Sequence, residues 1–167
     1  MKHVVGAGVC RFAALLLMFA LPAVASAPIF TVTPLTPFVI QSGPGGCPSF
    51  DVLFAPQAGR PNSGKTITFA NGSTISSGAV FVTATNLTSN KSINLNISGP
   101  GQFSVSDNTF TIFGPAFLEG FQDLGSADLP SVAFVKGQTV LQFDNTGHVI
   151  SVTHTGAAPQ DVCQSLD

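Results

Sequence analysis

Four side chains in the second half of the sequence could take part in acid–base chemistry. Glu119 and Asp123 are four residues apart, so they would share one face of a helix. Asp144 and His148 flank a turn and would come close across a hairpin. Two carboxyl groups can hydrolyse a glycosidic bond, and a histidine beside an acid can activate a nucleophile, when a cleft holds them at the required distance. A hydrolase with its site near residues 115–130 is therefore one hypothesis for function.

The sequence does not supply the partners that this chemistry needs. Serine is abundant, but no G-x-S-x-G nucleophile elbow is present. His154 follows His148 by six residues, which on an extended strand separates them by about 20 Å and prevents them from sharing a metal ion. We therefore expect solvated carboxylates and hydrogen-bonded histidines. No catalytic residue, metal site or cofactor is predicted.

Residues 59–66 read GRPNSGKT and match the nucleotide-binding pattern G-x-x-x-x-G-K-[ST] at every position. That pattern binds phosphate where backbone amides and the first turn of a following helix surround it. Here the next residues are ITFANG, a β-branched run that ends in the hairpin turn Asn71-Gly72. We interpret the match as a chance feature of a turn-rich loop. No nucleotide is expected as a ligand.

The first 25 residues indicate export. Lys2 and Arg11 precede an apolar run of ten residues, FAALLLMFAL, which a proline and the small residues AVASA follow. The run has about half the length that spans a membrane and is typical of a secretory signal peptide. Cleavage is predicted after Ala25. Because no second apolar run approaches membrane length, we expect a secreted, extracellular protein without a membrane span.

The mature chain carries little charge. After residue 25 it holds eight acidic and four basic residues, a net charge near −4, and the acids are scattered along the sequence. Nucleic acids and anionic membranes bind clustered Lys and Arg, so neither is expected as a partner. Trp and Tyr, which often anchor sugar- and protein-binding surfaces, are absent from the sequence. The composition therefore does not identify an extracellular partner.

Two cysteines, Cys47 and Cys163, remain after cleavage, because Cys10 lies in the predicted signal peptide. An even number of cysteines in an oxidising compartment predicts a disulfide. Metal binding or redox catalysis would require further ligands or a C-x-x-C spacing, and the sequence has neither. The bond would close a loop of 116 residues, which is nearly the whole domain.

Period-two alternation of apolar and polar residues through successive short runs predicts an all-β protein. Residues 26–46, rich in Pro and Gly, are expected to form an extended arm with an edge strand at 38–40, and residues 47–167 a single disulfide-closed β-domain. We predict an antiparallel sandwich or flattened barrel of about 8–10 strands, with one short helical insertion. Within residues 114–130, the spacing of apolar residues predicts either this helix, over 116–124, or an ordered Ω-loop. The expected strands of the domain are 50–54, 65–69, 73–76, 79–86, 92–98, 102–106, 109–113, 132–135, 139–144 and 148–155.

Three segments carry a resemblance to known proteins. CPSFDV (47–52), VTATNLTSNKSINLNISGPG (82–101) and the DVC tail (161–163) resemble small secreted actinobacterial proteins of uncharacterised function. The resemblance implies a secreted, disulfide-closed β-domain, and it brings no catalytic residues.

Three classes of function remain open at this point. The first is a non-catalytic extracellular or cell-surface module with a binding or structural role, which the sparse charge favours. The second is the hydrolase described above. The third is a carrier of an apolar ligand in a Phe-lined barrel, because 15 phenylalanines exceed the needs of a small core. N-glycosylation sequons occur at Asn71, Asn86, Asn90 and Asn96, and the sequence leaves their use open.

Overall fold

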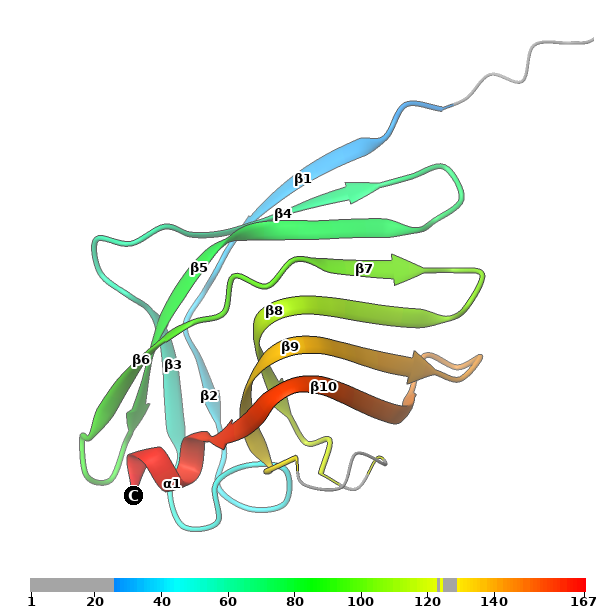
Figure 1. Cartoon of the computed structure of the whole chain (residues 1–167). Coiled ribbons are helices and arrows are strands. Elements are labelled where there is room, and N and C mark those ends of the chain that lie inside the picture. Colours follow the sequence, from blue (N-terminus) through cyan, green and yellow to red (C-terminus); the bar gives the residue numbers. More distant parts are fainter. Residues whose placement is uncertain (1–25, 123, 125–128) are drawn as a thin grey trace, which may run out of the picture.

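The computed structural model describes residues 26–122, 124 and 129–167 of the chain. The predicted signal peptide, its cleavage site at Ala25 and the candidate Asp123 lie outside the described residues. The described chain forms ten strands, all paired antiparallel, and one short helix (Figure 1). The all-β prediction with eight to ten antiparallel strands is therefore confirmed.

The strands form one sheet that branches at β5. The elements are β1 (Ile29–Pro34), β2 (Phe38–Ile40), β3 (Val52–Pro56), β4 (Asn62–Thr68), β5 (Thr74–Asn86), β6 (Ser92–Asn96), β7 (Gly101–Ser104), β8 (Thr109–Glu119), β9 (Val132–Phe143), β10 (Val149–Asp161) and α1 (Val162–Leu166). The main path runs β1-β4-β5-β7-β8-β9-β10, and β3 and β6 pair with the second half of β5, with β2 outside β3. The path ends at β1 and β10 without joining them, so the sheet is open and is not a closed barrel.

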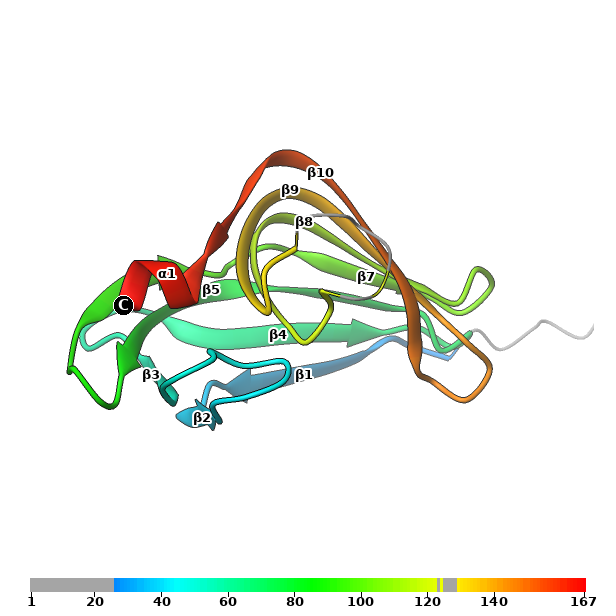
Figure 2. The ribbon, with the colours of Figure 1, turned by 90° about the horizontal axis from the view of Figure 1, so that it is seen from below.

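Glycines allow the long strands to bend without losing their register. Gly114, Gly137 and Gly156 lie side by side on β8, β9 and β10, and their φ angles of +88°, +143° and +146° are costly for other residues. A Cβ on Gly137 would lie 2.8 Å from the Gly156 Cα and would also clash with the Thr155 carbonyl oxygen. β8, β9 and β10 curve together (Figures 1 and 2), and the three glycines lie in the interior of these strands.

The strand boundaries differ from the prediction because two glycines lie inside strands and do not end them. The sequence predicted separate strands on either side of Gly78 and of Gly137, because glycine commonly ends a strand. Both glycines instead lie inside continuous strands, β5 and β9, of 13 and 12 residues. Gly78 is directly opposite Gly64 of β4, where a Cβ would come within 2.9 Å of the Gly64 Cα. These glycines therefore mark close backbone approach within the sheet.

The bent sheet packs against itself around a first core. The branch β2-β3-β5-β6 faces the halves of β8 and β9 that lie beyond the glycine row, and α1 covers one end. The rings of Phe54 and Phe117 meet across this interface with centroids 4.5 Å apart. The buried residues of this core are Ile40, Cys47, Phe50, Val52, Phe54, Val82, Ala84, Leu95, Val132, Phe134, Val162, Cys163 and Leu166.

A second core lies on the other side of β8–β10. Its buried residues are Ile112, Ala116, Leu118, Leu129, Ala133, Val135, Leu141 and Val152. Two described residues between β8 and β9, Phe121 and Leu124, pack on this cluster, and the Val152 amide donates to the Leu124 carbonyl oxygen at 2.8 Å. β8 and β9 are thus covered by apolar side chains on both faces.

The helix predicted over 116–124 is wrong. Residues 116–119 belong to β8, where Ala116 and Leu118 enter the second core while Phe117 enters the first. The apolar spacing that suggested a helix arises because this strand buries both of its faces. The described chain places its short helix, α1, at Val162–Leu166 instead.

The predicted disulfide between Cys47 and Cys163 is present, with Cα atoms 5.3 Å apart. It ties α1 to the segment before β3. Asn86 also holds α1 in place, because its buried side-chain amide donates to the Leu166 carbonyl oxygen at 3.1 Å.

The sequon asparagines Asn71, Asn90 and Asn96 are exposed, whereas the sequon at Asn86 is inaccessible in this fold. None of the described residues belongs to a helix of the length and apolar character needed to cross a membrane.

Candidate functional site

A cleft opens where the branch strand β6 faces the bend of β8–β10. Its volume is about 600 Å³, within the range of small-molecule binding sites. The lining residues come from four strands: Ile93, Asn94, Leu95 and Asn96 from β6, Pro115 from β8, Phe134 and Lys136 from β9, and Gln160 from β10. The cleft adjoins the first core, because two of its lining residues, Leu95 and Phe134, also belong to that core.

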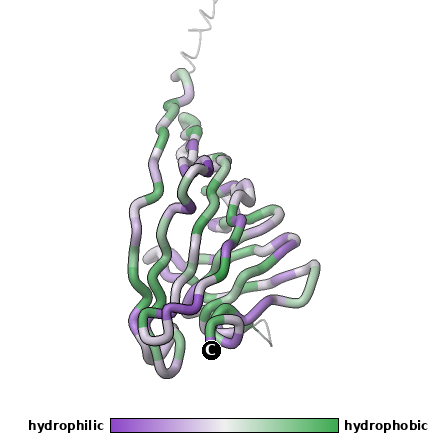
Figure 3. The backbone as a smooth tube through the Cα atoms, turned by 90° about the vertical axis from the view of Figure 1, so that its left-hand side faces the viewer, coloured by the Kyte–Doolittle hydropathy of each residue, from purple (hydrophilic) through white to green (hydrophobic). Residues whose placement is uncertain are grey.

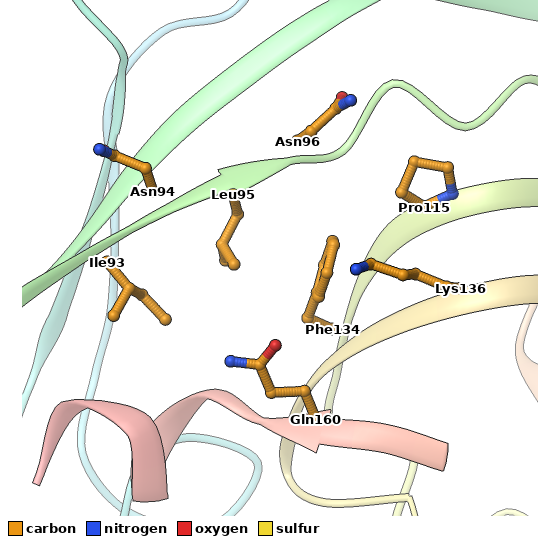
Figure 4. Close-up of a pocket in the computed structure, with 8 residues that line it drawn as sticks. All are labelled: Ile93, Asn94, Leu95, Asn96, Pro115, Phe134, Lys136 and Gln160. Atoms are coloured by element: carbon orange, nitrogen blue, oxygen red, sulfur yellow. The ribbon is translucent and has the colours of Figure 1, made fainter. Parts of the chain in front are cut away.

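Strand alternation gives one wall of the cleft its apolar character. β6 pairs with β5 and with no other strand of the described chain, so it is an edge strand. Its sequence SINLN directs Ile93 and Leu95 into the cleft, while Asn94 and Asn96 point the other way (Figure 4). Asn94 is held outside by the Thr83 hydroxyl, which donates to its side-chain oxygen at 2.8 Å.

Strand register assembles the opposite wall. Pro115 is paired with Lys136, and Phe134 with Gln160, so these four side chains share one face of β8–β10. Pro115 and Phe134 supply apolar surface, whereas Lys136 and Gln160 supply polar groups. The glycine row lies immediately beside Pro115 and Lys136, so the bend determines how far this wall stands from β6.

Lys136 is the cation of the cleft. Its side chain is exposed, and the Nζ atom lies 5.3 Å from the centre of the Phe134 ring (Figure 4). A cation at this distance is attracted to the ring face, which favours a position above the apolar floor. Within the described residues, the one contact between a basic side chain and a side-chain carboxylate is that of His148 with Asp144, and Lys136 contacts no carboxylate. The Lys136 ammonium is therefore available to an anionic group of a ligand.

Asp144 and His148 lie close together, as the sequence predicted, and their hydrogen bonds stabilise the turn between β9 and β10. One Asp144 oxygen accepts hydrogen bonds from the Thr146 hydroxyl at 2.7 Å and from the backbone amides of Thr146 and His148 at 2.8 and 2.9 Å. These bonds, chiefly that from the Thr146 hydroxyl, lower the pKa of Asp144 to about 2. The His148 side chain is 82% exposed, with its Nδ1 3.7 Å from the second Asp144 oxygen. The pair stands in solvent, without the cleft that hydrolysis requires.

Glu119 lies far from this turn. It ends β8 opposite Val132, the first residue of β9, whereas Asp144 follows the last residue of β9. Twelve residues of strand separate them, about 40 Å along the chain. Partial burial raises the pKa of Glu119, and the one side-chain ion pair among the described residues, between Asp144 and His148, does not involve it. The hydrolase hypothesis thus lacks a site among the described residues, and Asp123 lies outside them.

The remaining motifs of the sequence have structural roles. His154 is held by the Thr139 hydroxyl at 2.9 Å and by the Ala157 carbonyl oxygen at 3.0 Å. The segment that matches a nucleotide-binding loop continues into β4, and no helix follows it; the Thr66 hydroxyl bonds to Ser76 across the β4–β5 pair. In the described part of the chain, no three His, Cys, Asp or Glu side chains gather as a metal site would require.

No pattern in the sequence pointed directly to the cleft. Alternation predicted that Ile93 and Leu95 point inward, but Phe134, Lys136 and Gln160 are brought opposite them by a bend that depends on three glycines. The Phe-lined barrel of the carrier hypothesis does not form either, because the sheet is open and Phe134 is the one phenylalanine among the lining residues.

The chain was compared with models of protein families, with curated proteins and with solved structures. No match was found. The function must therefore be inferred from the geometry of the cleft and from the sequence.

Proposed function

We propose that the protein is a secreted, non-catalytic extracellular binding module whose ligand site is the cleft between β6 and β8–β10. The observation that carries the proposal is the combination of apolar walls with one accessible cation at the mouth of the core. Binding sites for small ligands share this composition, in which apolar surface supplies affinity and a few polar groups fix orientation. Among the described candidates for acid–base chemistry, Glu119, Asp144 and His148 are not among the residues that line the cleft, which favours binding over catalysis.

The chemistry of the cleft selects one class of ligand. Ile93, Leu95 and Phe134 can cover an apolar chain or ring, which would add about 25 cal/mol for each Å² removed from water. Lys136 can bind a carboxylate, sulfonate or phosphate through a charge-assisted hydrogen bond. We therefore propose a small amphiphilic anion as the ligand, with its apolar part beneath the Lys136 ammonium.

Decanoate is a suitable probe, because it joins a carboxylate to a short apolar chain. Isothermal titration calorimetry of the mature protein is expected to show one bound decanoate. Lys136→Gln should weaken binding about tenfold, since it removes one charge-assisted contact of about 1.4 kcal/mol. Lys65→Gln is the matched control: Lys65 is also exposed, but it lies on β4 away from the cleft.

Two results would contradict the proposed site. Titration of the wild-type protein without a binding signal would show that the cleft does not hold amphiphilic anions. Equal weakening by Lys136→Gln and Lys65→Gln would show that decanoate responds to overall charge and does not depend on the cleft.

Secretion is the second part of the proposal. It is supported by the apolar leader of the sequence and by the Cys47–Cys163 bond, since disulfides persist in oxidising compartments. When the full-length chain is expressed in a secreting host, we expect the protein in the medium to begin at Ser26. Mass spectrometry of the secreted protein measures this. Retention of the intact chain in the cytoplasm, with Met1 to Ala25 present, would refute export.

A further inference from the structure

The backbone of β6 has one edge that the sheet does not use, because β6 pairs with β5 alone among the described strands. At one end of this pair the Ile97 amide donates to the Val80 carbonyl oxygen at 2.9 Å. At the other end the Asn86 amide donates to the Lys91 carbonyl oxygen, also at 2.9 Å. Because bonded residues alternate along an antiparallel ladder, the odd-numbered residues of β6 bond to β5. The N–H and C=O groups of the even-numbered residues therefore point away from β5.

This free edge of β6 borders the cleft. Asn94 and Asn96 line the cleft although their side chains point away from it (Figure 4), so their main chain forms its rim. Both residues are exposed, as is Ser92, the third even-numbered residue of the strand. β6 lies on the side of the molecule that faces the viewer in Figure 3, and hydrophobic and hydrophilic residues alternate along it. The same strand therefore offers backbone hydrogen-bonding groups at its edge and the apolar side chains of Ile93 and Leu95 on its inner face.

The two ends of the cleft differ in charge. Just beyond the end of β6, the Gly99 amide donates to the Pro115 carbonyl oxygen at 2.7 Å, which joins this part of the chain to β8. Pro115 is paired with Lys136 of β9. Lys136 therefore lies at the end of the cleft toward which β6 runs, and Ile93 lies at the other end (Figure 4). A chain that lay along β6 in the same direction would bring its C-terminus to the Lys136 ammonium.

We propose that the ligand of the cleft is the C-terminal segment of an extended peptide, which adds to β6 as a parallel strand and binds Lys136 through its terminal carboxylate. The inference rests on the proposed function of the cleft and names its ligand class, since a peptide that ends in apolar residues is an amphiphilic anion. Charge complementarity with Lys136 sets the direction of the strand. In strand addition, main-chain hydrogen bonds supply affinity and alternate side chains supply specificity.

The free edge of β6 favours a peptide over a plain hydrocarbon chain. Three residues of this five-residue strand face outward, so the edge offers three N–H and three C=O groups over about 17 Å. An alkyl chain would cover these groups without bonding to them, which costs free energy, whereas a peptide strand bonds to them. A peptide of about five residues matches the length of the edge, and its alternate side chains would face Ile93, Leu95 and Phe134.

The acetylated pentapeptide VTVTV with a free C-terminus is a suitable probe, because valine alternates with threonine along it. Isothermal titration calorimetry of the mature protein should show one bound peptide, which decanoate displaces. The peptide should bind at least tenfold more tightly than decanoate, because it adds main-chain hydrogen bonds. The same peptide with an amidated C-terminus should bind about tenfold more weakly than the acid, since it lacks the charge that Lys136 recognises.

Asn94→Pro tests the free edge of β6. Proline lacks the N–H group, and at this position the missing group is one that points outward, so pairing with β5 is retained. The substitution should weaken peptide binding about tenfold and leave decanoate binding unchanged. Asn94→Ala is the matched control, because it also removes the hydrogen bond from Thr83 but keeps the backbone N–H. Circular dichroism melting establishes that both variants are folded before they are compared.

Two N-methylated peptides test the same edge with the unaltered protein. Alternate N–H groups of an added strand face its partner, so methylation at residues 2 and 4 of VTVTV blocks one set and methylation at residues 3 and 5 blocks the other. One of these peptides should bind at least tenfold more weakly than the unmethylated peptide. The other should bind like the unmethylated peptide.

The results separate failure of strand addition from failure of the proposed function. Decanoate binding that Lys136→Gln weakens, without peptide binding up to about 1 mM, would overturn strand addition and leave the proposed function intact. Equal peptide binding by Asn94→Pro and Asn94→Ala, or equal binding of the two N-methylated peptides, would contradict pairing along β6. Equal binding of the acid and the amide would overturn the assignment of the terminal carboxylate to Lys136. Absence of binding for both decanoate and the peptide would refute the proposed function itself.

Discussion

Replacing Cys47 and Cys163 together by alanine is expected to lower the free energy of unfolding by about 4–5 kcal/mol. The disulfide closes a loop of 116 residues, and the entropy that such a closure removes from the unfolded chain gives this magnitude. The bond also holds α1 against the first core, where Val162 and Leu166 are fully buried. For a domain of this size the loss corresponds to a decrease in the melting temperature of about 10–20 °C.

Urea denaturation followed by circular dichroism measures this loss. The wild-type protein in the presence of a reductant serves as the control and should approach the stability of the double variant. A double variant within about 1 kcal/mol of the oxidised wild type would show that packing of α1, rather than the disulfide, holds the ends of the domain together.

Gly137→Ala is expected to destabilise the fold by about 4 kcal/mol or more. Gly137 has a φ angle of +143°, and its Cα faces both the Thr155 carbonyl oxygen and Gly156 across the β9–β10 pair. The added methyl group would strain the backbone and also separate the two strands. Since the bend positions Lys136 and Phe134, the same substitution should abolish binding of the decanoate probe.

Gly147→Ala is the matched control for this substitution. Gly147 also has a positive φ, of +87°, but a Cβ there would contact nothing within 4 Å. Its expected cost is the conformational penalty of about 1–2 kcal/mol. Thermal melting of both variants compares the two effects. Equal destabilisation would contradict the role assigned to the glycine row, because it would show that close strand approach at Gly137 adds nothing.

Local patterns in the sequence predicted most of the strands but not their extent, and they missed β1, whose residues were expected to belong to an extended arm. Alternation at Ile93, Leu95 and their neighbours predicted the buried face of β6, and Asn71-Gly72 predicted the β4–β5 hairpin. Gly78 and Gly137 were misinterpreted as strand ends, because a glycine that ends a strand and one that allows close packing look alike in one sequence. The pairing of Gly114, Gly137 and Gly156 becomes visible when the register is known.

The candidate site shows the same limit. The proximity of Asp144 and His148 was predicted correctly from the sequence, because a short turn joins them and local hydrogen bonds hold that turn. The position of Lys136 and Phe134 opposite β6 could not be predicted in this way. That arrangement joins segments about 40 residues apart through a bend in three strands. The free edge of β6 along the cleft is likewise a property of strand order and register, which a single sequence does not contain.

The cleft and the free edge of β6 can be tested separately, although they lie side by side. Decanoate requires the apolar walls and Lys136, whereas the peptide also requires the outward-facing backbone groups of β6. Asn94→Pro should therefore affect the peptide alone, and Lys136→Gln should weaken both ligands. Failure of strand addition would leave the binding of small amphiphilic anions standing.

The location of the bound probe tests the central claim most directly. Addition of decanoate to the mature, ¹⁵N-labelled protein should shift the amide resonances of β6 and of residues 134–136 and 160, with the largest changes around Lys136. The resonances of the distant strands β1 and β4 should remain unchanged. Shifts confined to these two strands, or no shifts at a decanoate concentration that saturates the calorimetric signal, would contradict the assignment of the cleft as the ligand site.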